Sequence, residues 1–143
     1  MDATISSIMT ANPASCRPAT PLREVAQMMV DHDCGQIPVV DEASRPIGVV
    51  TDRDIAVRLV ARGGESRDAT AIDIMSSPCR TVAADTALAD CTQLMESAQI
   101  RRVPVVDAQG RLAGIVSIAD IALAGRDRAT AEVVTEVSKP PAH

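Results

Sequence analysis

The chain has 143 residues, 46% of them apolar, but it contains no Phe, Tyr or Trp. This length fits one compact domain or two very small ones, whose cores must be filled by small aliphatic side chains and Met. The formal net charge of −5 and the lack of aromatic stacking platforms argue against nucleic acid as the main partner. They do not exclude one small phosphorylated ligand, because the local charge of a site can differ from the net charge.

The first residues, MDATISSIMTANPAS, contain an acid at position 2 and no basic segment followed by an apolar stretch. They therefore do not resemble a secretory signal peptide. No apolar run approaches the ~20 residues that a membrane-spanning helix needs. We expect a cytoplasmic protein that does not associate with membranes.

The first half of the chain predicts a series of short helices and strands. A short helical turn over Ile5–Met9 leads to an extended piece at Ser15–Cys16. Thr20 and Pro21 are typical of an N-cap and a first helical residue, and the segment LREVAQMMVDH has apolar side chains at helical spacing. The runs IPVVD and IGVVT, joined by the turn-rich EASRP, predict a β-hairpin. A second helix is expected over Asp52–Ala61.

The second half repeats this order at an offset of 66 residues without a gap. DAT at 2–4 matches DAT at 68–70, PVVD at 38–41 matches PVVD at 104–107, and DIA at 54–56 matches DIA at 120–122. The repeat predicts unit 1 over residues 1–61, a linker over 62–68, unit 2 over 69–124 and a tail over 125–143. Each unit is too small to bury its core well alone, so the two should pack face to face about an approximate two-fold axis.

Both hairpins end in the same pattern, GVVTDRD from Gly48 and GIVSIAD from Gly114. Glycine leaves room for backbone or ligand to approach closely. A hydroxyl where strand turns into helix, as at Thr51, can cap the helix and hold a phosphate oxygen. The carboxylate of Asp54 lies on the same side of the first helical turn and can accept from two ribose hydroxyls. The same residues also form an ordinary capping box, so a purely structural role stays open.

The order β-α-β-β-α, written twice with this motif, resembles a tandem pair of cystathionine-beta-synthase-type (CBS) domains, often called a Bateman module. The resemblance covers about residues 4–124. It implies a mixed α/β fold of two pseudo-symmetric β-α-β-β-α CBS units packed through their sheets. It also implies a non-enzymatic regulatory or sensor module that needs no cofactor and binds an adenosine-containing nucleotide in a cleft between the units.

The resemblance also bears on ligands and partners. AMP, ADP and ATP are the ligands it favours, with S-adenosylmethionine and NAD as further candidates. Tandem pairs of this family usually form flat dimers through their helices, so a homodimer is expected. An effector protein is implied as well, but the sequence does not identify it.

In such pairs, residues at the start of one hairpin can reach a ligand held by the aspartate of the other unit. Carried over by position, Arg101 or Arg102 approaches the phosphate of a nucleotide held by Thr51 and Asp54. Arg53, between these two motif residues, adds a further base. The resemblance therefore predicts that the first motif copy belongs to the better nucleotide site.

The reciprocal site is expected around Ser117 and Asp120. It is faced by Gly35 and Gln36, which carry no charge. This site should bind more weakly, or prefer a ligand with little phosphate.

The adenine has no aromatic partner in this chain. It is expected to lie between aliphatic side chains, with Ile37, Val103 or the Met residues as candidates. Its edge should bond to backbone groups near Pro38 or Pro104. Both prolines also fit a plain structural role at the start of an edge strand.

Two alternatives remain open at this point. The first is a structural or stress-related interaction protein that keeps the fold and binds no ligand. The second is a thiol-linked or metal-linked sensor built on Cys16, Cys34 and His32, although strong zinc spacings are missing. An enzyme is not expected, because no pairing of nucleophile with base and no catalytic triad is apparent.

Overall fold

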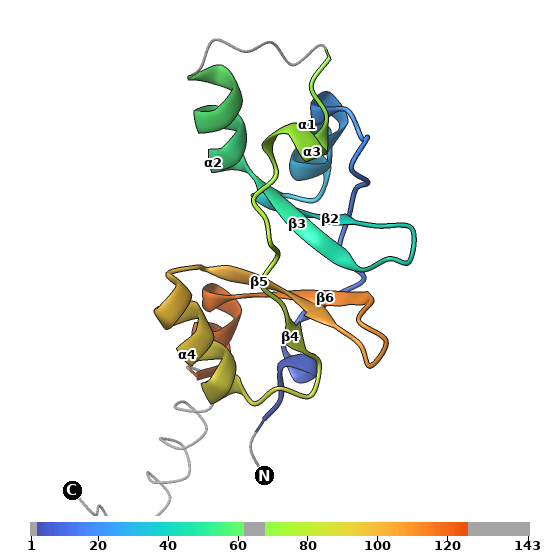
Figure 1. Ribbon diagram of the computed structural model, residues 1–143. Helices are drawn as coiled ribbons and strands as arrows, with labels where there is room; N and C mark the ends of the chain where they lie inside the picture. The colour runs from blue at the N-terminus through green and yellow to red at the C-terminus, as the bar shows by residue number, and fades with distance from the viewer. Residues whose placement is uncertain (1–2, 62–67, 126–143) are drawn as a thin grey trace, which may run out of the picture.

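The computed structural model describes residues 3–61 and 68–125, and the chain forms two stacked halves (Figure 1). In the upper half, β2 (Gln36–Val40) and β3 (Pro46–Thr51) form an antiparallel hairpin. In the lower half, β5 (Arg102–Val106) and β6 (Leu112–Ser117) form the matching hairpin. The hairpins face each other and the helices cover their outer sides, so the predicted packing through the sheets is confirmed.

The remaining elements complete a mixed α/β fold. They are η1 (Ile5–Ser7), β1 (Thr10–Ala11), α1 (Leu22–Asp31), α2 (Asp52–Asp54) continued by the π-helix η2 (Ile55–Val60), α3 (Ala71–Ile74), β4 (Val82–Ala83), α4 (Leu88–Ala98) and the helical residues 118–125. In the described ranges, none of these helices has the length and apolar character to cross a bilayer. Most of the predicted linker and tail, residues 62–67 and 126–143, lies outside the described residues.

Each half has its own aliphatic core. Three β-branched residues of each hairpin face the helices of the same half: Ile37, Val39 and Val50 in one, and Val103, Val105 and Val116 in the other. Side chains alternate across a strand, so the neighbouring residues Pro38 and Pro104 lie on the opposite faces, between the two hairpins. Since both prolines are fully buried, the contact between the hairpins is closely packed.

Each core is completed by a leading segment from the other repeat. Residues 3–11, the leading segment of repeat 1, pair through β1 with β6, and Ile5 is fully buried in the β5–β6 core. Residues 69–76, the leading segment of repeat 2, cross to the β2–β3 half, where Ile74 is buried. The two halves are therefore interlocked, because separating them would open both cores.

This exchange explains the glycine of the repeated motif. A Cβ on Gly48 would lie 2.7 Å from Sδ of Met75 and 2.9 Å from the backbone oxygen of Ser76. A Cβ on Gly114 would lie 2.9 Å from the backbone oxygen of Thr10. Rotating a side chain cannot relieve a contact with a backbone oxygen, so each glycine makes room for a leading segment. Close approach of backbone, the first of the two predicted uses of glycine, is present at both positions.

The aspartate of each PVVD run closes its hairpin loop. Oδ1 of Asp41 accepts from two backbone N–H groups of the loop at 2.9 and 3.0 Å, and Oδ1 of Asp107 does the same at 2.9 and 3.0 Å. The N–H of Arg111 is the main cause that holds the pKa of Asp107 below its usual value. A left-handed residue follows in each loop, Ser44 with φ 64° and Gly110 with φ 79°.

One local prediction is wrong, because Thr20 does not cap the first long helix. α1 begins at Leu22 after the extended residue Pro21, and the Thr20 hydroxyl accepts instead from the N–H of Arg17 at 2.9 Å. The N–H of Leu22 donates to the backbone oxygen of Ala69 at 3.0 Å. A tertiary contact with the leading segment of repeat 2 thus takes the place of the predicted cap.

Candidate ligand-binding sites

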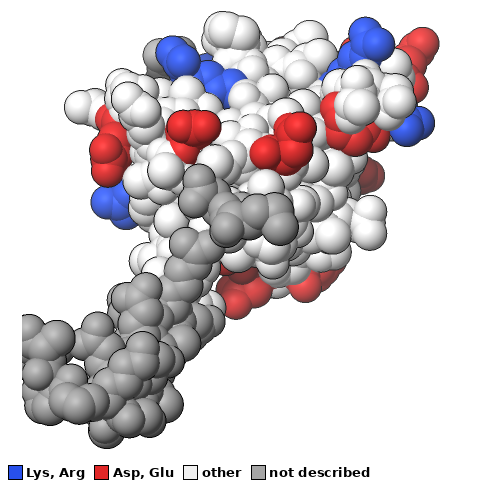
Figure 2. Space-filling model, turned by 90° about the horizontal axis from the view of Figure 1, so that it is seen from below, with Lys and Arg blue, Asp and Glu red and all other residues white. Residues whose placement is uncertain are grey.

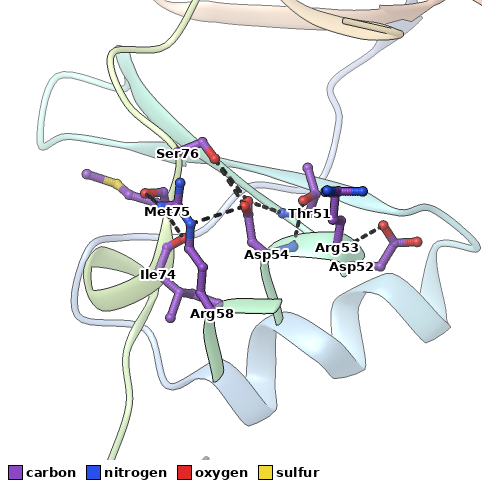
Figure 3. A network of polar contacts seen from close by, with 8 residues as sticks. All are labelled: Thr51, Asp52, Arg53, Asp54, Arg58, Ile74, Met75 and Ser76. Carbon is purple, nitrogen blue, oxygen red and sulfur yellow. Dashed lines mark hydrogen bonds and ion pairs between the residues drawn. The ribbon is translucent and has the colours of Figure 1, made fainter. Parts of the chain in front are cut away.

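Both copies of the motif form the same ring of hydrogen bonds. The N–H of Asp54 donates to Oγ1 of Thr51 at 3.0 Å, and the N–H of Thr51 donates to Oδ2 of Asp54 at 2.9 Å (Figure 3). Ser117 and Asp120 repeat these bonds at 3.0 and 2.9 Å. The capping box is therefore present in both copies. It leaves Oδ1 of each aspartate outside the ring.

The carboxylate of Asp54 has two further partners. Oγ of Ser76 donates to it, at 3.1 Å from Oδ1 and 3.3 Å from Oδ2, and Nε of Arg58 lies 3.8 Å from Oδ1. Nη1 of Arg58 also donates to the backbone oxygen of Met75 at 3.1 Å, so Arg58 connects η2 to the leading segment of repeat 2 (Figure 3). Within the described part of the chain, Asp120 accepts only from the N–H of Ser117.

A pocket of about 990 Å³, here called the larger pocket, opens beside Thr51 and Asp54. Its lining residues come from both repeats: Gln36, Val49, Thr51, Asp52, Arg53, Asp54, Val57, Arg58, Ser76, Pro78, Cys79, Arg80, Gln99, Ile100, Arg101, Arg102 and Pro104. Five of these are arginines and two are aspartates, which gives the lining a formal charge of +3. Figure 2 shows the face seen from below, where separate acidic side chains are spread over the surface and basic side chains lie near its edges. The chain carries a net charge of −5, yet five of its 14 Lys and Arg residues line this pocket.

The larger pocket brings together most of the residues predicted for the first site. Thr51, Arg53 and Asp54 come from the first repeat, and Arg101, Arg102 and Pro104 come from the second. Their assembly across the contact between the halves matches the predicted position of a nucleotide. That they bind one stays a prediction.

Several lining residues of this site were not predicted from the sequence, among them the polar residues Arg58, Ser76 and Arg80. Arg58 stands one helical turn after Asp54, and this spacing could have identified it. Arg80 and Ser76 lie near the end of the segment that crosses between the halves, so their position depends on the exchange. No local pattern in the sequence signals that exchange.

A smaller pocket of about 340 Å³ opens beside Ser117 and Asp120. Its other lining residues are Thr10, Asn12, Pro13, Ala14, His32, Asp33, Cys34, Gln36, Arg102, Ile115 and Val116. The predicted neighbour Gln36 lines it, but Gly35 does not. Two aspartates and one arginine give this lining a formal charge of −1 with His neutral, which is opposite in sign to that of the larger pocket.

Gln36 and Arg102 hold equivalent places in the two repeats, and both line both pockets. Gln36 is only 9% exposed, and its Oε1 has no hydrogen-bond partner within the described residues. A buried acceptor without a partner is costly. Gln36 therefore offers an acceptor to a ligand that enters either pocket.

The structure does not bring the predicted adenine contacts Ile37 and Val103 to either pocket. Both side chains are fully buried in the two aliphatic cores, and neither residue lines a pocket. The physical reason is strand alternation, which turns each of them away from the face between the hairpins. Pro38 lies on that face but is fully buried and lines neither pocket, whereas Pro104 lines the larger one.

Cys16, Cys34 and His32 are not brought together as a metal site. Cys16 belongs to the β2–β3 core, where burial raises the pKa of its thiol to about 11. Cys34 and His32 line the smaller pocket. Over residues 3–61 and 68–125, no group of three or more His, Cys, Asp or Glu side chains could hold a metal ion.

Comparison with known proteins identifies the architecture. The family model described as CBS domain matches residues 5–61 and 71–127. Hypoxic response protein 1 of Mycobacterium tuberculosis is 34% identical over 139 residues, which cover 97% of this chain and 96% of that protein. An uncharacterized protein of Methanopyrus kandleri is 40% identical over 98 residues, which are 68% of this chain and half (50%) of that protein.

Solved structures agree with this assignment. Hypoxic Response Protein I with two coordinated zinc ions aligns with a TM-score of 0.77 at 36% identity, covering 84% of this chain and 97% of that one. The CBS domain pair of protein MJ0100, in complex with 5′-methylthioadenosine and S-adenosyl-L-methionine, aligns with a TM-score of 0.80 at 26% identity, covering 90% of this chain and 99% of that one. CBSX2 in complex with AMP aligns with a TM-score of 0.74 at 26% identity, covering 87% of this chain and 96% of that one. The chain therefore belongs to the CBS domain family, as a tandem pair of CBS domains in the form of a Bateman module.

Proposed function

We propose that this chain is a non-enzymatic regulatory module that binds an adenosine nucleotide such as AMP, ADP or ATP in the larger pocket. The observation that carries the proposal is the set of five arginines beside Thr51 and Asp54 in a chain of formal charge −5. Arginine is well suited to phosphate oxygens because its planar guanidinium donates several hydrogen bonds. The similar CBS pairs in complex with AMP or S-adenosyl-L-methionine support an adenosine-containing ligand.

Each part of the nucleotide has a matching group in this pocket. Asp54 offers acceptors to the ribose hydroxyls, as a carboxylate can accept from two donors. Arg101 and Arg102 offer donors to the phosphate from the other repeat. For the adenine, the apolar lining residues Val49 and Ile100 take the place of the residues predicted from the sequence.

The smaller pocket suits a different member of the same ligand class. Its lining of charge −1 disfavours a phosphate, and Asp120 has an oxygen free of hydrogen bonds within the described residues. We propose that it takes an adenosine-containing ligand with little phosphate. S-adenosylmethionine fits this description because its amino group and sulfonium centre are cationic.

We also propose that the module is a homodimer that signals ligand occupancy to an effector protein. Val30 on α1 and Val60 in η2 are 72% and 66% exposed, and both lie on the outer helices. A second copy packed against these helices would remove this apolar surface from water. Analytical ultracentrifugation should give twice the monomer mass, and Val60→Glu should lower it to that of a monomer.

Isothermal titration calorimetry with AMP, ATP, adenosine and S-adenosylmethionine tests the proposed ligand. AMP or ATP should bind, and bound ligand should raise the melting temperature. Asp54→Asn, which keeps an acceptor for the helix cap, should abolish most of this binding, whereas Asp120→Asn should not. The assignment is wrong if Asp120→Asn removes nucleotide binding and Asp54→Asn leaves it unchanged. If no compound in the panel binds, the chain is better described as an interaction protein that keeps the fold without a ligand.

A further inference from the structure

The two motif copies differ in the residue one helical turn after the aspartate. Arg58 follows Asp54 by four positions, and Ala124 follows Asp120 by four. Positions 58 and 124 are equivalent in the repeat of 66 residues, and both lie in the helix that begins at the motif. Ala124 has no charged donor to offer a carboxylate or a phosphate, whereas Arg58 has its guanidinium.

This difference changes how many acceptor sites the two aspartates can offer. Oδ1 of Asp54 already receives the hydroxyl of Ser76 at 3.1 Å and faces Nε of Arg58 at 3.8 Å. Within residues 3–61 and 68–125, Oδ1 of Asp120 has no such partner. A ribose that binds Asp54 therefore competes with existing partners, and a ribose that binds Asp120 does not.

We propose that Arg58 makes a phosphate group a requirement for tight binding in the larger pocket, and that Ala124 leaves the smaller pocket without this requirement. The inference rests on the proposed function, since it assumes that adenosine-type ligands bind beside Asp54 and Asp120. A plain nucleoside separates Arg58 from Asp54 and offers the guanidinium nothing in return. A nucleotide offers it a phosphate inside the same pocket, because Arg58 lines that pocket too.

The strength of the ion pair between Arg58 and Asp54, compared with that of a hydrogen bond to phosphate, decides whether AMP or adenosine binds more tightly. The side chain of Arg58 is 44% exposed, and an ion pair of this kind changes an equilibrium constant by at most about fivefold. A charge-assisted hydrogen bond to phosphate typically contributes about tenfold or more. The gain from phosphate therefore exceeds the cost of releasing Arg58, and AMP is favoured over adenosine. Arg58 is in this sense a specificity-determining residue of the larger pocket.

Titration of the full chain with adenosine and with AMP tests the proposal. The larger pocket is isolated in an Asp120→Asn background, where Arg58→Ala should raise the affinity for adenosine up to about fivefold. The same substitution should lower the affinity for AMP about tenfold. Arg53→Ala is the matched control, because it removes one positive charge from the same pocket and helix, while Arg53 has no ion pair with Asp54. It should not improve adenosine binding.

The reciprocal variant places an arginine at the equivalent position of the second repeat. In an Asp54→Asn background, Ala124→Arg should weaken adenosine binding and strengthen AMP binding in the smaller pocket. If Arg58→Ala leaves the ratio of AMP to adenosine affinity unchanged, the inference is overturned while the proposed function stands. If neither adenosine nor AMP binds the wild-type chain, the proposed function fails and the inference fails with it.

Discussion

The motif at Thr51–Asp54 and the motif at Ser117–Asp120 have the same two hydrogen bonds at the same 3.0 and 2.9 Å distances. Yet one opens on a pocket of formal charge +3 and the other on a pocket of charge −1. The shared parts are those that the fold needs, such as the glycine, the cap and the loop aspartate. The shared cap residues line the pockets as well. Among the residues that differ between the repeats, Arg58, Arg80 and Arg101 line only the larger pocket and account for much of its positive charge. The comparison therefore separates what the fold requires of both copies from what distinguishes the two pockets.

The largest expected effect concerns the glycine that both copies of the motif share. Gly48→Ala and Gly114→Ala should each destabilise the chain by about 2–3 kcal/mol, because the new Cβ would overpack against the backbone of a leading segment. Urea unfolding followed by circular dichroism measures this loss. Gly125→Ala is the control, since a Cβ there meets nothing within 4 Å. Equal stability of the three variants would mean that the leading segments do not pack against the motif glycines.

The next largest effect concerns the arginines that line one pocket or both. Arg101 lines only the larger pocket, whereas Arg102 lines both. Arg101→Ala should weaken AMP binding about tenfold by removing one charge-assisted hydrogen bond, and should leave ligand binding beside Asp120 unchanged. Arg102→Ala should affect both pockets. Calorimetric titration in the two aspartate-to-asparagine backgrounds measures each pocket separately, and a uniform effect of Arg101→Ala on both would count against the predicted difference.

A smaller effect concerns the caps. Thr51→Ala and Ser117→Ala should each cost about 1 kcal/mol of unfolding free energy, because each removes the acceptor for the N–H of an aspartate. Thr51→Ser keeps the hydroxyl and should change stability little. A loss at one position only would show that the two rings are not energetically equivalent, despite their matching distances.

The smallest effect concerns the hairpin loops. Ser44 has φ 64° where the equivalent Gly110 has φ 79°. Glycine adopts this left-handed conformation without the steric penalty of a side chain, so Ser44→Gly should stabilise the chain by about 0.5–1 kcal/mol. The converse Gly110→Ser should destabilise it by a similar amount in the same unfolding assay. A loss of stability with Ser44→Gly would mean that the Ser44 side chain contributes more than its strained backbone costs.

Much of the fold could be predicted because the two halves of the chain can be compared with each other. The offset that aligns Asp54 with Asp120 also aligns the hairpins and helices, so each element is predicted twice. The exchange of leading segments could not be predicted in this way. A repeat of fixed offset is the same whether residues 3–11 pack on their own unit or on the other one.

The candidate site could be predicted in part for the same reason. The resemblance to CBS pairs indicated the start of the second hairpin, and comparison of the two repeats showed that arginines stand there, at Arg101 and Arg102, only in the second. The sequence could not show that Ile37 and Val103 face the cores, because a strand buried on both faces has a continuous apolar run, which does not reveal which face meets the core. Arg58 could have been found from its spacing to Asp54, whereas the place of Arg80 in the larger pocket depends on the exchange of leading segments.

The most direct test of the central claim is a crystal structure of the chain grown with AMP and adenosine together. The two unequal pockets predict AMP beside Thr51 and Asp54, with its phosphate among the arginines. They predict adenosine beside Ser117 and Asp120. A phosphate beside Asp120, with the larger pocket empty or occupied by adenosine, would contradict the account.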